Sequence, residues 1–509
     1  DVYKRQVMKN INKLAFATLF ATSVFSMSCT DLDERLYSVI PQDKFGTTTE
    51  EINALIGPAY GTLVNWVNDQ FWYAQVSSDE YMIPARGLDW LSGGIYLRYQ
   101  RHEWRAEECP NLWHFTDVTT INKTLNLLET TTVVVQDKER IMAELRGLRA
   151  LWYFVMLDGI GSVPIVTKYE EGLPTNKDVT RKDVYDFVEE ELLAIKDQLT
   201  EEVSTTTYGK FTKWACYTLM AKLYINAEVY TGTPQWEKAL DCCNKVIEGG
   251  KYILEPDINT NFKVKNEGSK ENILIVPYDY NYFRGYFIPY QMSWHYSSNK
   301  TFDFDCDCWN GPCAVPGFVH KYDDDDVRKK WFMYGQQYGP SGEKLKDRNG
   351  NDLNITIDIV DFENATEVEG ARLYKWEPEK GGHNHLNNDF AIFRYSDILL
   401  MKAECMLRIS DANEPEARAI VNEVRSRNFN PWTEDKEIKK LTLENLLDER
   451  GFEFVFEGWR RNDQIRFGTF GDTWDFKPNK DDPDKHTWVF PIPLAEIQKN
   501  PSLVQNKGY

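Results

Sequence analysis

The sequence lacks the short motifs by which many enzymes are recognised. It contains no nucleophile elbow, phosphate-binding loop, zinc-protease signature or dinucleotide fingerprint. Carboxylate pairs of the glycosidase type are brought together in space, and no spacing along this chain singles out such a pair. We therefore expect a protein without catalytic residues.

Positive charge and long apolar runs are also scarce. The chain has 59 lysines and arginines against 79 aspartates and glutamates, a net charge of -20, which argues against nucleic acid or an anionic membrane surface as the main partner. Beyond residue 28, no stretch is long and apolar enough to span a bilayer. The 509 residues suffice for a large core, so no metal is needed for size alone. No cofactor is expected. A disulfide among Cys306, Cys308 and Cys313 is left open.

The N-terminus has the proportions of a targeting segment. A short basic region around Lys9 precedes the apolar run LAFATLFATSVF, which is too short for a membrane-spanning helix. The tetrapeptide SMSC that follows resembles a bacterial lipobox, so we predict that residues 1–28 are a lipoprotein signal peptide and that Cys29 is lipidated. Residues 1–7 precede Met8, a candidate initiator. An ordinary secretory signal is the alternative. The acidic residues behind Cys29 resemble the signal that sends some lipoproteins to the outer face of the outer membrane.

Helical periodicity dominates the rest of the chain. Apolar residues recur at helical spacing in segments that begin at capping residues such as Thr180 and end at glycines such as Gly159. Small residues within aromatic hairpins of about 34 residues are typical of tetratricopeptide units. We predict a mainly α fold with four irregular hairpins of this kind, at about residues 47–67 with 112–130, 138–199, 212–249 and 395–427.

Two regions without a helical period interrupt these helices, at about residues 68–111 and 251–390. Glycine and proline punctuate them, and the second contains short strand-like runs such as Asn272 to Val276. Both are rich in aromatic residues, unlike disordered segments. We expect ordered loops whose rings converge in the fold and present flat faces to a ligand. For any single ring, packing in the core is the alternative.

Acidic loops raise the question of calcium. Asp347 and Asn349 begin like a calcium loop, but the required glycine is absent, and Asn349-Gly350 favours a hairpin turn. The alternating acids from Asp303 to Asp307 and the run from Asp323 to Asp326 are interpreted as solvated loops, with bound calcium as the alternative.

A third group of acids lies near the C-terminus. Glu449, Glu453 and Glu457 repeat every four residues, which places them on one face of a predicted helix. The arginines of the same segment are Arg450, Arg460, Arg461 and Arg466. Apolar residues are interspersed among these charges, so the pattern favours a partly buried ion-pair network over a catalytic pair.

Several blocks of sequence together resemble one known family. LDERGFEFVFEGWRRNDQIRFG and FPIPLAEIQKNPSLVQNKGY, in the C-terminal segment 440–509, are similar to the closing signature of the SusD/RagB family. FRYSDILLMKAECM and YGKFTKWACYTLMAKLYINA are similar to other blocks of that family. The resemblance covers the chain from Cys29 as a single domain, residues 29–509. It implies a SusD-like fold in which the helical hairpins are the scaffold and the loops and short strands carry the ligand site.

The resemblance also implies a function. Members of the family are lipid-anchored nutrient-binding proteins at the cell surface of the outer membrane, and their partner is a SusC-like TonB-dependent transporter. We therefore expect this chain to bind an oligosaccharide or polysaccharide and deliver it to such a transporter. A peptide-binding, RagB-like role and a surface glycoside hydrolase are the alternatives.

By the same resemblance, the segment SSDEYMIPARGLDW matches the ligand-side loop of the family, and aromatic residues of the later loop region complete the site. Sugars stack their C–H faces on aromatic rings, while carboxylate, amide and guanidinium groups bond their hydroxyls. The residues predicted to bind ligand are Asp79, Arg86, Trp90, Trp104, Trp294, Tyr296, Trp309 and Asn310.

Overall fold

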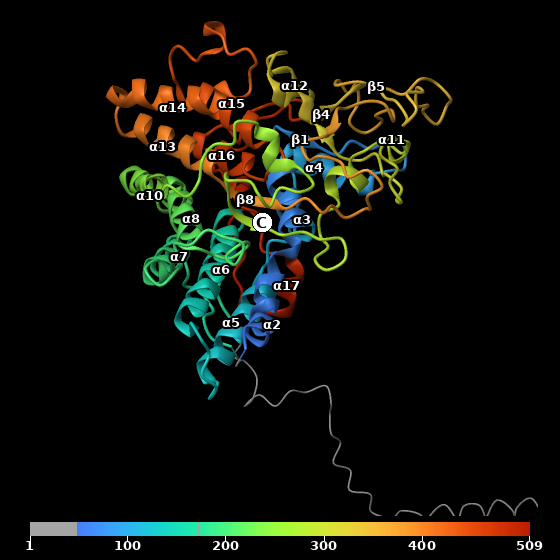
Figure 1. The fold of residues 1–509 in the computed structure, drawn as a ribbon. Helices are drawn as coiled ribbons and strands as arrows, with labels where there is room; N and C mark the ends of the chain where they lie inside the picture. The colour runs from blue at the N-terminus through green and yellow to red at the C-terminus, as the bar shows by residue number, and fades with distance from the viewer. Residues whose placement is uncertain (1–47, 170–173) are drawn as a thin grey trace, which may run out of the picture.

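The computed structural model describes residues 48–169 and 174–509, drawn as a ribbon in Figure 1. The predicted signal peptide and the lipidation site at Cys29 lie outside the described residues. Within the described ranges, none of the helices has both the length and the apolar character that crossing a membrane requires.

Paired helices occupy the left and lower parts of Figure 1. The pairs are α2 (Thr49–Gly61) with α5 (Phe115–Thr130), α6 (Lys138–Gly159) with α7 (Arg181–Ile195), α8 (Lys213–Ile225) with α10 (Trp236–Glu248), and α13 (Tyr395–Ile409) with α14 (Glu414–Ser426). Consecutive pairs also pack on each other, through α5 and α6, α7 and α8, and α10 and α13. The predicted mainly α scaffold of helical hairpins is confirmed.

Local sequence sets the bounds of these helices. The side chain of Thr48 accepts the Glu51 backbone N–H at 3.2 Å, and the Glu51 carboxylate accepts the Thr48 N–H at 3.1 Å. Thr180 and Asp183 form the same reciprocal cap at the start of α7. Helix α6 ends at Gly159, as its sequence predicted. These caps satisfy backbone groups that the helix itself leaves without partners.

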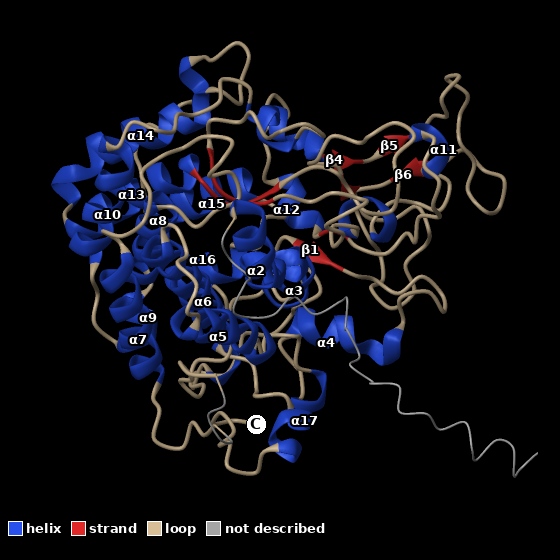
Figure 2. Cartoon of the chain, turned by 60° about the horizontal axis from the view of Figure 1, so that its bottom comes forward, coloured by secondary structure: helices blue, strands red, loops and turns tan. Residues whose placement is uncertain are grey.

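Loops and most of the short strands lie on the other side of the molecule in Figures 1 and 2, while β8 lies near its centre (Figure 1). Four antiparallel ribbons organise them: β1 (Tyr81–Met82) with β3 (Cys313–Ala314), β2 (Asn272–Val276) with β8 (Phe390–Arg394), β4 (Phe332–Met333) with β7 (Arg372–Leu373), and β5 (Gly335–Gln336) with β6 (Asn354–Ile355). Short helices lie among the ribbons: α11 (Asn299–Phe302) and α12 (Pro316–His320). The β1–β3 ribbon joins the two aromatic-rich regions directly.

The first loop region is more helical than its sequence indicated. The first helix ends at Gly61, not near residue 67, and is followed by α3 (Trp66–Gln70), a π-helical turn over residues 71–75, and α4 (Ile95–Arg101). The sequence predicted a loop-rich segment without a sustained helical period, and these helical turns within it were not predicted. The sequence of the π-helical turn shows no amphipathic period because most of the turn is buried, with both Phe71 and Tyr73 in the core.

The C-terminal segment packs across the helical pairs. It contains α15 (Leu443–Phe454), α16 (Arg460–Phe467) and α17 (Leu494–Lys499). Helix α15 contacts α13 and α14, while α16 contacts the π-helical turn and α9 (Ala227–Thr231). This segment therefore ties early and late parts of the chain together.

The acids of this segment form a buried ion-pair network, as the sequence predicted. Glu453 lies 2.6 Å from Arg427 and 3.0 Å from Arg394, and Glu457 lies 2.6 Å from Lys375. None of these side chains is more than 6% exposed. The network is structural, because each charge is paired inside the core.

The predicted partners within this network were wrong. Glu457 lies beyond the end of α15, and Glu449 pairs with Arg328 and Arg425 from other parts of the chain. The arginines nearby in sequence pair with other acids; for example, Arg450 lies 2.9 Å from Asp397. Sequence proximity failed as a guide because long side chains reach across packed elements.

Candidate functional site

The two aromatic-rich loop regions meet at Trp90 and Trp309. The indole Nε1 of Trp90 donates a hydrogen bond of 2.8 Å to the main-chain carbonyl of Trp309. The two ring centroids lie 6.4 Å apart with an interplanar angle of 44°. The hypothesis that the two regions converge in the fold is confirmed.

These rings belong to a continuous row that faces solvent in part. Each ring lies within 6.4 Å of the next, and Trp309 is the most exposed, at 42%. We call this set the aromatic row: Trp72, Tyr96, Trp90, Trp309 and Phe287. Partly exposed rings in a row offer a flat apolar surface to a ligand.

Backbone geometry holds Trp90 in the row. It follows a tight turn in which the Arg86 N–H donates to the Asp89 carbonyl at 2.8 Å, and its own φ is +62°, in the left-handed region that non-glycine residues rarely adopt. The Trp90 ring lies against Gly311, where an added Cβ would come within 2.2 Å of the ring. Unfavourable backbone conformations persist where surrounding structure enforces them, and they cluster at functional sites.

Polar side chains stand beside the row. The Tyr296 hydroxyl donates to the Asp89 carboxylate at 2.5 Å, and the Arg348 guanidinium lies 3.4 Å above the centroid of the Tyr296 ring. Arg348 also lies 3.6 Å from Asp89. Asp89 and Arg348 are exposed, so their unfilled hydrogen-bonding positions are open to a polar ligand. Arg348 was not predicted from the sequence, because only the fold brings its hairpin next to Tyr296 and Asp89.

Arg86 and Asn310 lie beneath this surface. The Arg86 guanidinium donates to the carbonyls of Asn310 and Glu369 at 2.8 Å each, and the Asn310 side chain accepts from Arg372 at 2.6 Å. Burial lowers the pKa of Arg372, and the nearby Arg86 lowers it further. The structure therefore gives Arg86 and Asn310 a supporting position, where backbone carbonyls take the hydrogen bonds expected for a ligand.

Three other predicted residues also lie away from the row. Trp294 is fully buried and donates to the Leu373 carbonyl at 2.6 Å, while Trp104 is in the core and donates to the Tyr509 hydroxyl at 2.7 Å. Asp79 lies at a separate pocket. Of the eight predicted residues, the structure brings three together at the surface, namely Trp90, Tyr296 and Trp309. Their contact with a ligand stays a prediction.

No metal centre is evident among residues 48–169 and 174–509, where no group of three or more histidine, cysteine or acidic side chains is placed to hold an ion. The Asp347 carboxylate instead accepts the backbone N–H groups of Asn349 and Asn351 at 2.9 and 2.8 Å. These bonds close a hairpin turn, as Asn349-Gly350 predicted.

Two family models match the chain. One, described as "SusD family", matches residues 248–509, and another, described as "Starch-binding associating with outer membrane", matches residues 64–225. The chain belongs to the SusD family. The family and fold predicted from the sequence blocks are therefore confirmed.

Relatives and solved structures agree with this membership. The chain is 26% identical over 436 residues to starch-binding protein SusD of Bacteroides thetaiotaomicron, a match that covers 77% of each chain. It is 21% identical to SusD-like protein P38 of Formosa agariphila, over 98% of this chain and 99% of that one. Its fold is similar to surface glycan-binding protein A from B. thetaiotaomicron in complex with laminarihexaose, with a TM-score of 0.71, 22% identity, and coverage of 90% of this chain and 100% of that chain.

Proposed function

We propose that this protein binds a neutral glycan on the aromatic row and holds it without cleaving it. The observation that carries the proposal is the partly exposed Trp90–Trp309 pair, assembled from two distant loops beside Asp89 and Tyr296. Sugar rings stack C–H faces on such indoles, and their hydroxyls bond carboxylate and phenol groups. Similar proteins include a starch-binding protein and a surface glycan-binding protein, which supports this substrate class.

Charge favours a neutral ligand over a polyanionic one. At the edge of the row, the positive Arg348 is already opposed by Asp89, so no net positive charge is available to an acidic glycan. The whole chain carries a net charge of -20, which repels polyanions at long range.

Delivery is the second part of the proposal. Family membership supports a SusC-like TonB-dependent transporter as the partner and an outer-membrane location at the cell surface, with a lipid on Cys29 as the anchor. Cys29 lies outside the described residues, so its lipidation is tested chemically. Purification from outer membranes is expected to recover a large β-barrel transporter, and mass spectrometry is expected to find acylated Cys29. Recovery of the protein alone would contradict the partnership.

The binding test compares retention of neutral polysaccharides in affinity gel electrophoresis. Trp309→Ala and Trp90→Ala are expected to weaken retention by at least about tenfold each, since stacking and area are lost. Trp432→Ala is the control, because this partly exposed tryptophan lies outside the row and packs on Phe429. Unchanged retention in both row variants would reject this surface as the site.

The same samples distinguish the alternatives. Long incubation with the retained polysaccharide is expected to release no reducing ends; release would indicate a glycoside hydrolase. Binding of peptides without binding of any glycan would instead indicate the RagB-like role.

A further inference from the structure

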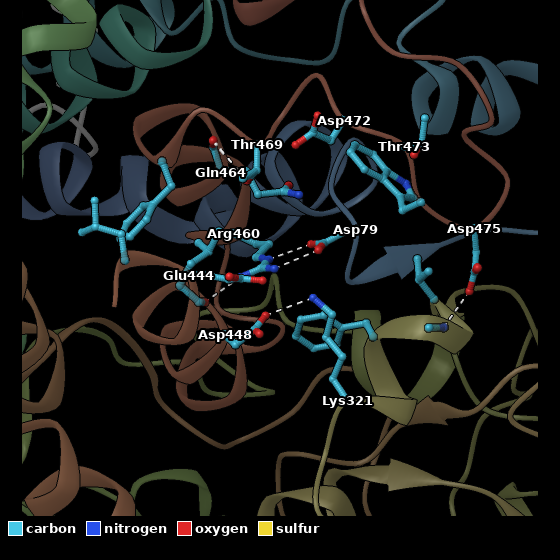
Figure 3. A pocket seen from close by; sticks show the side chains of 17 residues that line it. Asp79, Lys321, Glu444, Asp448, Arg460, Gln464, Thr469, Asp472, Thr473 and Asp475 are labelled. Atoms are coloured by element: carbon cyan, nitrogen blue, oxygen red, sulfur yellow. Dashed lines mark hydrogen bonds and ion pairs between the residues drawn. The ribbon is translucent and has the colours of Figure 1, made fainter. Parts of the chain in front are cut away.

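A cavity lies at the end of the β1–β3 ribbon away from the aromatic row. It measures about 610 Å³ and is lined by residues of α12, α15 and α16 and of the loop over residues 469–475. Asp79 precedes β1 and lines this cavity, whereas Trp90 follows β1 and stands in the aromatic row. The cavity shares no lining residue with the row, and Figure 3 shows its side chains from close by. Its volume suits a small ligand.

The cations of this cavity are already held by acids. Arg460 binds the Asp79 carboxylate through two hydrogen bonds of 2.6 and 2.8 Å, and Lys321 lies 3.0 Å from Asp448 (Figure 3). Because Arg460 outweighs the effect of burial, the pKa of Asp79 stays below its ordinary value. An anionic ligand would therefore find paired cations and an excess of carboxylates.

Other polar groups of the cavity have no partner. Gln464 is only 2% exposed, and its Oε1 is buried without a hydrogen bond among the described residues. The Nε1 of Trp474 is likewise buried and unpartnered within that part of the chain. Glu444, at the rim, forms no ion pair within the described ranges and is exposed in the first turn of α15. A buried polar group without a partner costs about 1–3 kcal/mol, so a ligand that pairs with such a group is favoured.

We propose that this cavity is a second saccharide site, which takes one neutral sugar residue or the end of a glycan chain. Sugar hydroxyls both donate and accept, so they suit a cavity lined by an amide (Gln464), a carboxylate (Glu444) and an indole (Trp474). The cavity also has apolar walls, including Phe318, against which the C–H face of a sugar packs. The proposal does not rest on binding at the aromatic row.

The test first removes the two tryptophans of the aromatic row, so that any remaining sugar binding comes from elsewhere. In a Trp90→Ala/Trp309→Ala background, saturation-transfer NMR is run with glucose, galactose, mannose and N-acetylglucosamine at millimolar concentration. At least one sugar is expected to bind. Adding Glu444→Ala is expected to weaken this binding about tenfold, the loss of one charge-assisted hydrogen bond. Adding Thr473→Trp, at an exposed residue of the lining loop, is expected to fill the cavity and abolish it.

Glu416→Ala is the matched control, because Glu416 is an exposed acid in the first turn of α14 as Glu444 is in α15. Circular dichroism checks that each variant folds. Binding that persists in Thr473→Trp, or no signal from any of the four sugars, would overturn the proposal. Preferential binding of butylammonium over every sugar would also overturn it. Sugar binding here combined with failed polysaccharide retention at the row would reject the proposed function and leave this site standing.

Discussion

Arg394 holds the carboxylate of Glu457 through two hydrogen bonds, 2.8 Å from Nε and 2.7 Å from Nη2, where both side chains are almost fully buried. Its other nitrogen reaches Glu271 at 2.6 Å, so one guanidinium joins a strand of the loop-rich side to the C-terminal segment. Burial works against the charge of Arg394, but these carboxylates outweigh it and raise its pKa well above the ordinary value.

Arg394→Met is expected to lower the free energy of unfolding by about 3–5 kcal/mol, because it removes one of the cations that pair with the buried carboxylates of Glu271, Glu453 and Glu457. Urea denaturation followed by circular dichroism measures the change. Lys439→Met, at an exposed lysine that pairs only with surface acids, is the control and is expected to leave the midpoint unchanged. Equal effects of the two substitutions would show that the buried network contributes nothing specific.

Glu80 gives a pH-dependent prediction. Burial raises the pKa of its carboxyl from an ordinary 4.5 to about 8, and its Oε2 has no hydrogen-bond partner among the described residues. Between these values the folded state binds more protons than the unfolded state, so the contribution of Glu80 to stability falls as pH rises from 4.5 to 8.

Glu80→Gln removes this titration. We expect the variant to gain on the order of a few kcal/mol over the wild type at pH 9, with the gain shrinking toward pH 5. Urea unfolding across this range is the measurement. A difference that stays constant with pH would contradict the assignment.

Gly311→Ala tests whether ligand binding needs the Trp90 ring in its position against Gly311. The new Cβ would lie 2.2 Å from the indole, so the ring must move out of the row. Glycan retention is expected to fall about tenfold or more, with a shift in tryptophan fluorescence. Gly268→Ala is the matched control, since an added Cβ there meets nothing within 4 Å. Retention equal to that of the control would mean that Trp90 does not need this position.

Arg348→Met tests the polar edge of the row. Loss of the guanidinium above the Tyr296 ring is expected to weaken glycan binding about two- to fivefold while the row stays intact. Lys344→Met, on the same hairpin but paired with Asp352, is expected to have no effect. Calorimetry with the retained glycan separates the two outcomes, and a stronger loss in Lys344→Met would contradict this role.

The sequence predicts the helical scaffold well, because apolar spacing and residues such as Thr180 and Gly159 act locally. It also indicated that rings around Trp90 and Trp309 would meet. It did not reveal that Arg86 and Asn310 are buried, since the carbonyls that accept their hydrogen bonds come from residues far away in the chain. In loops without a period, no local signal distinguishes a ring such as Trp294, which packs, from one such as Trp309, which does not.

Helix α16 changes how the helical pairs respond to stress. Pairs that touch only their neighbours behave as a one-dimensional array and can open from an end. Here Arg461 of α16 reaches Asp158 in α6 at 3.3 Å, and Arg466 reaches Glu404 in α13 at 2.8 Å. Helix α16 thereby links an early helical pair to a late one. Heat or protease is therefore expected to unfold the helical pairs in one cooperative transition rather than pair by pair.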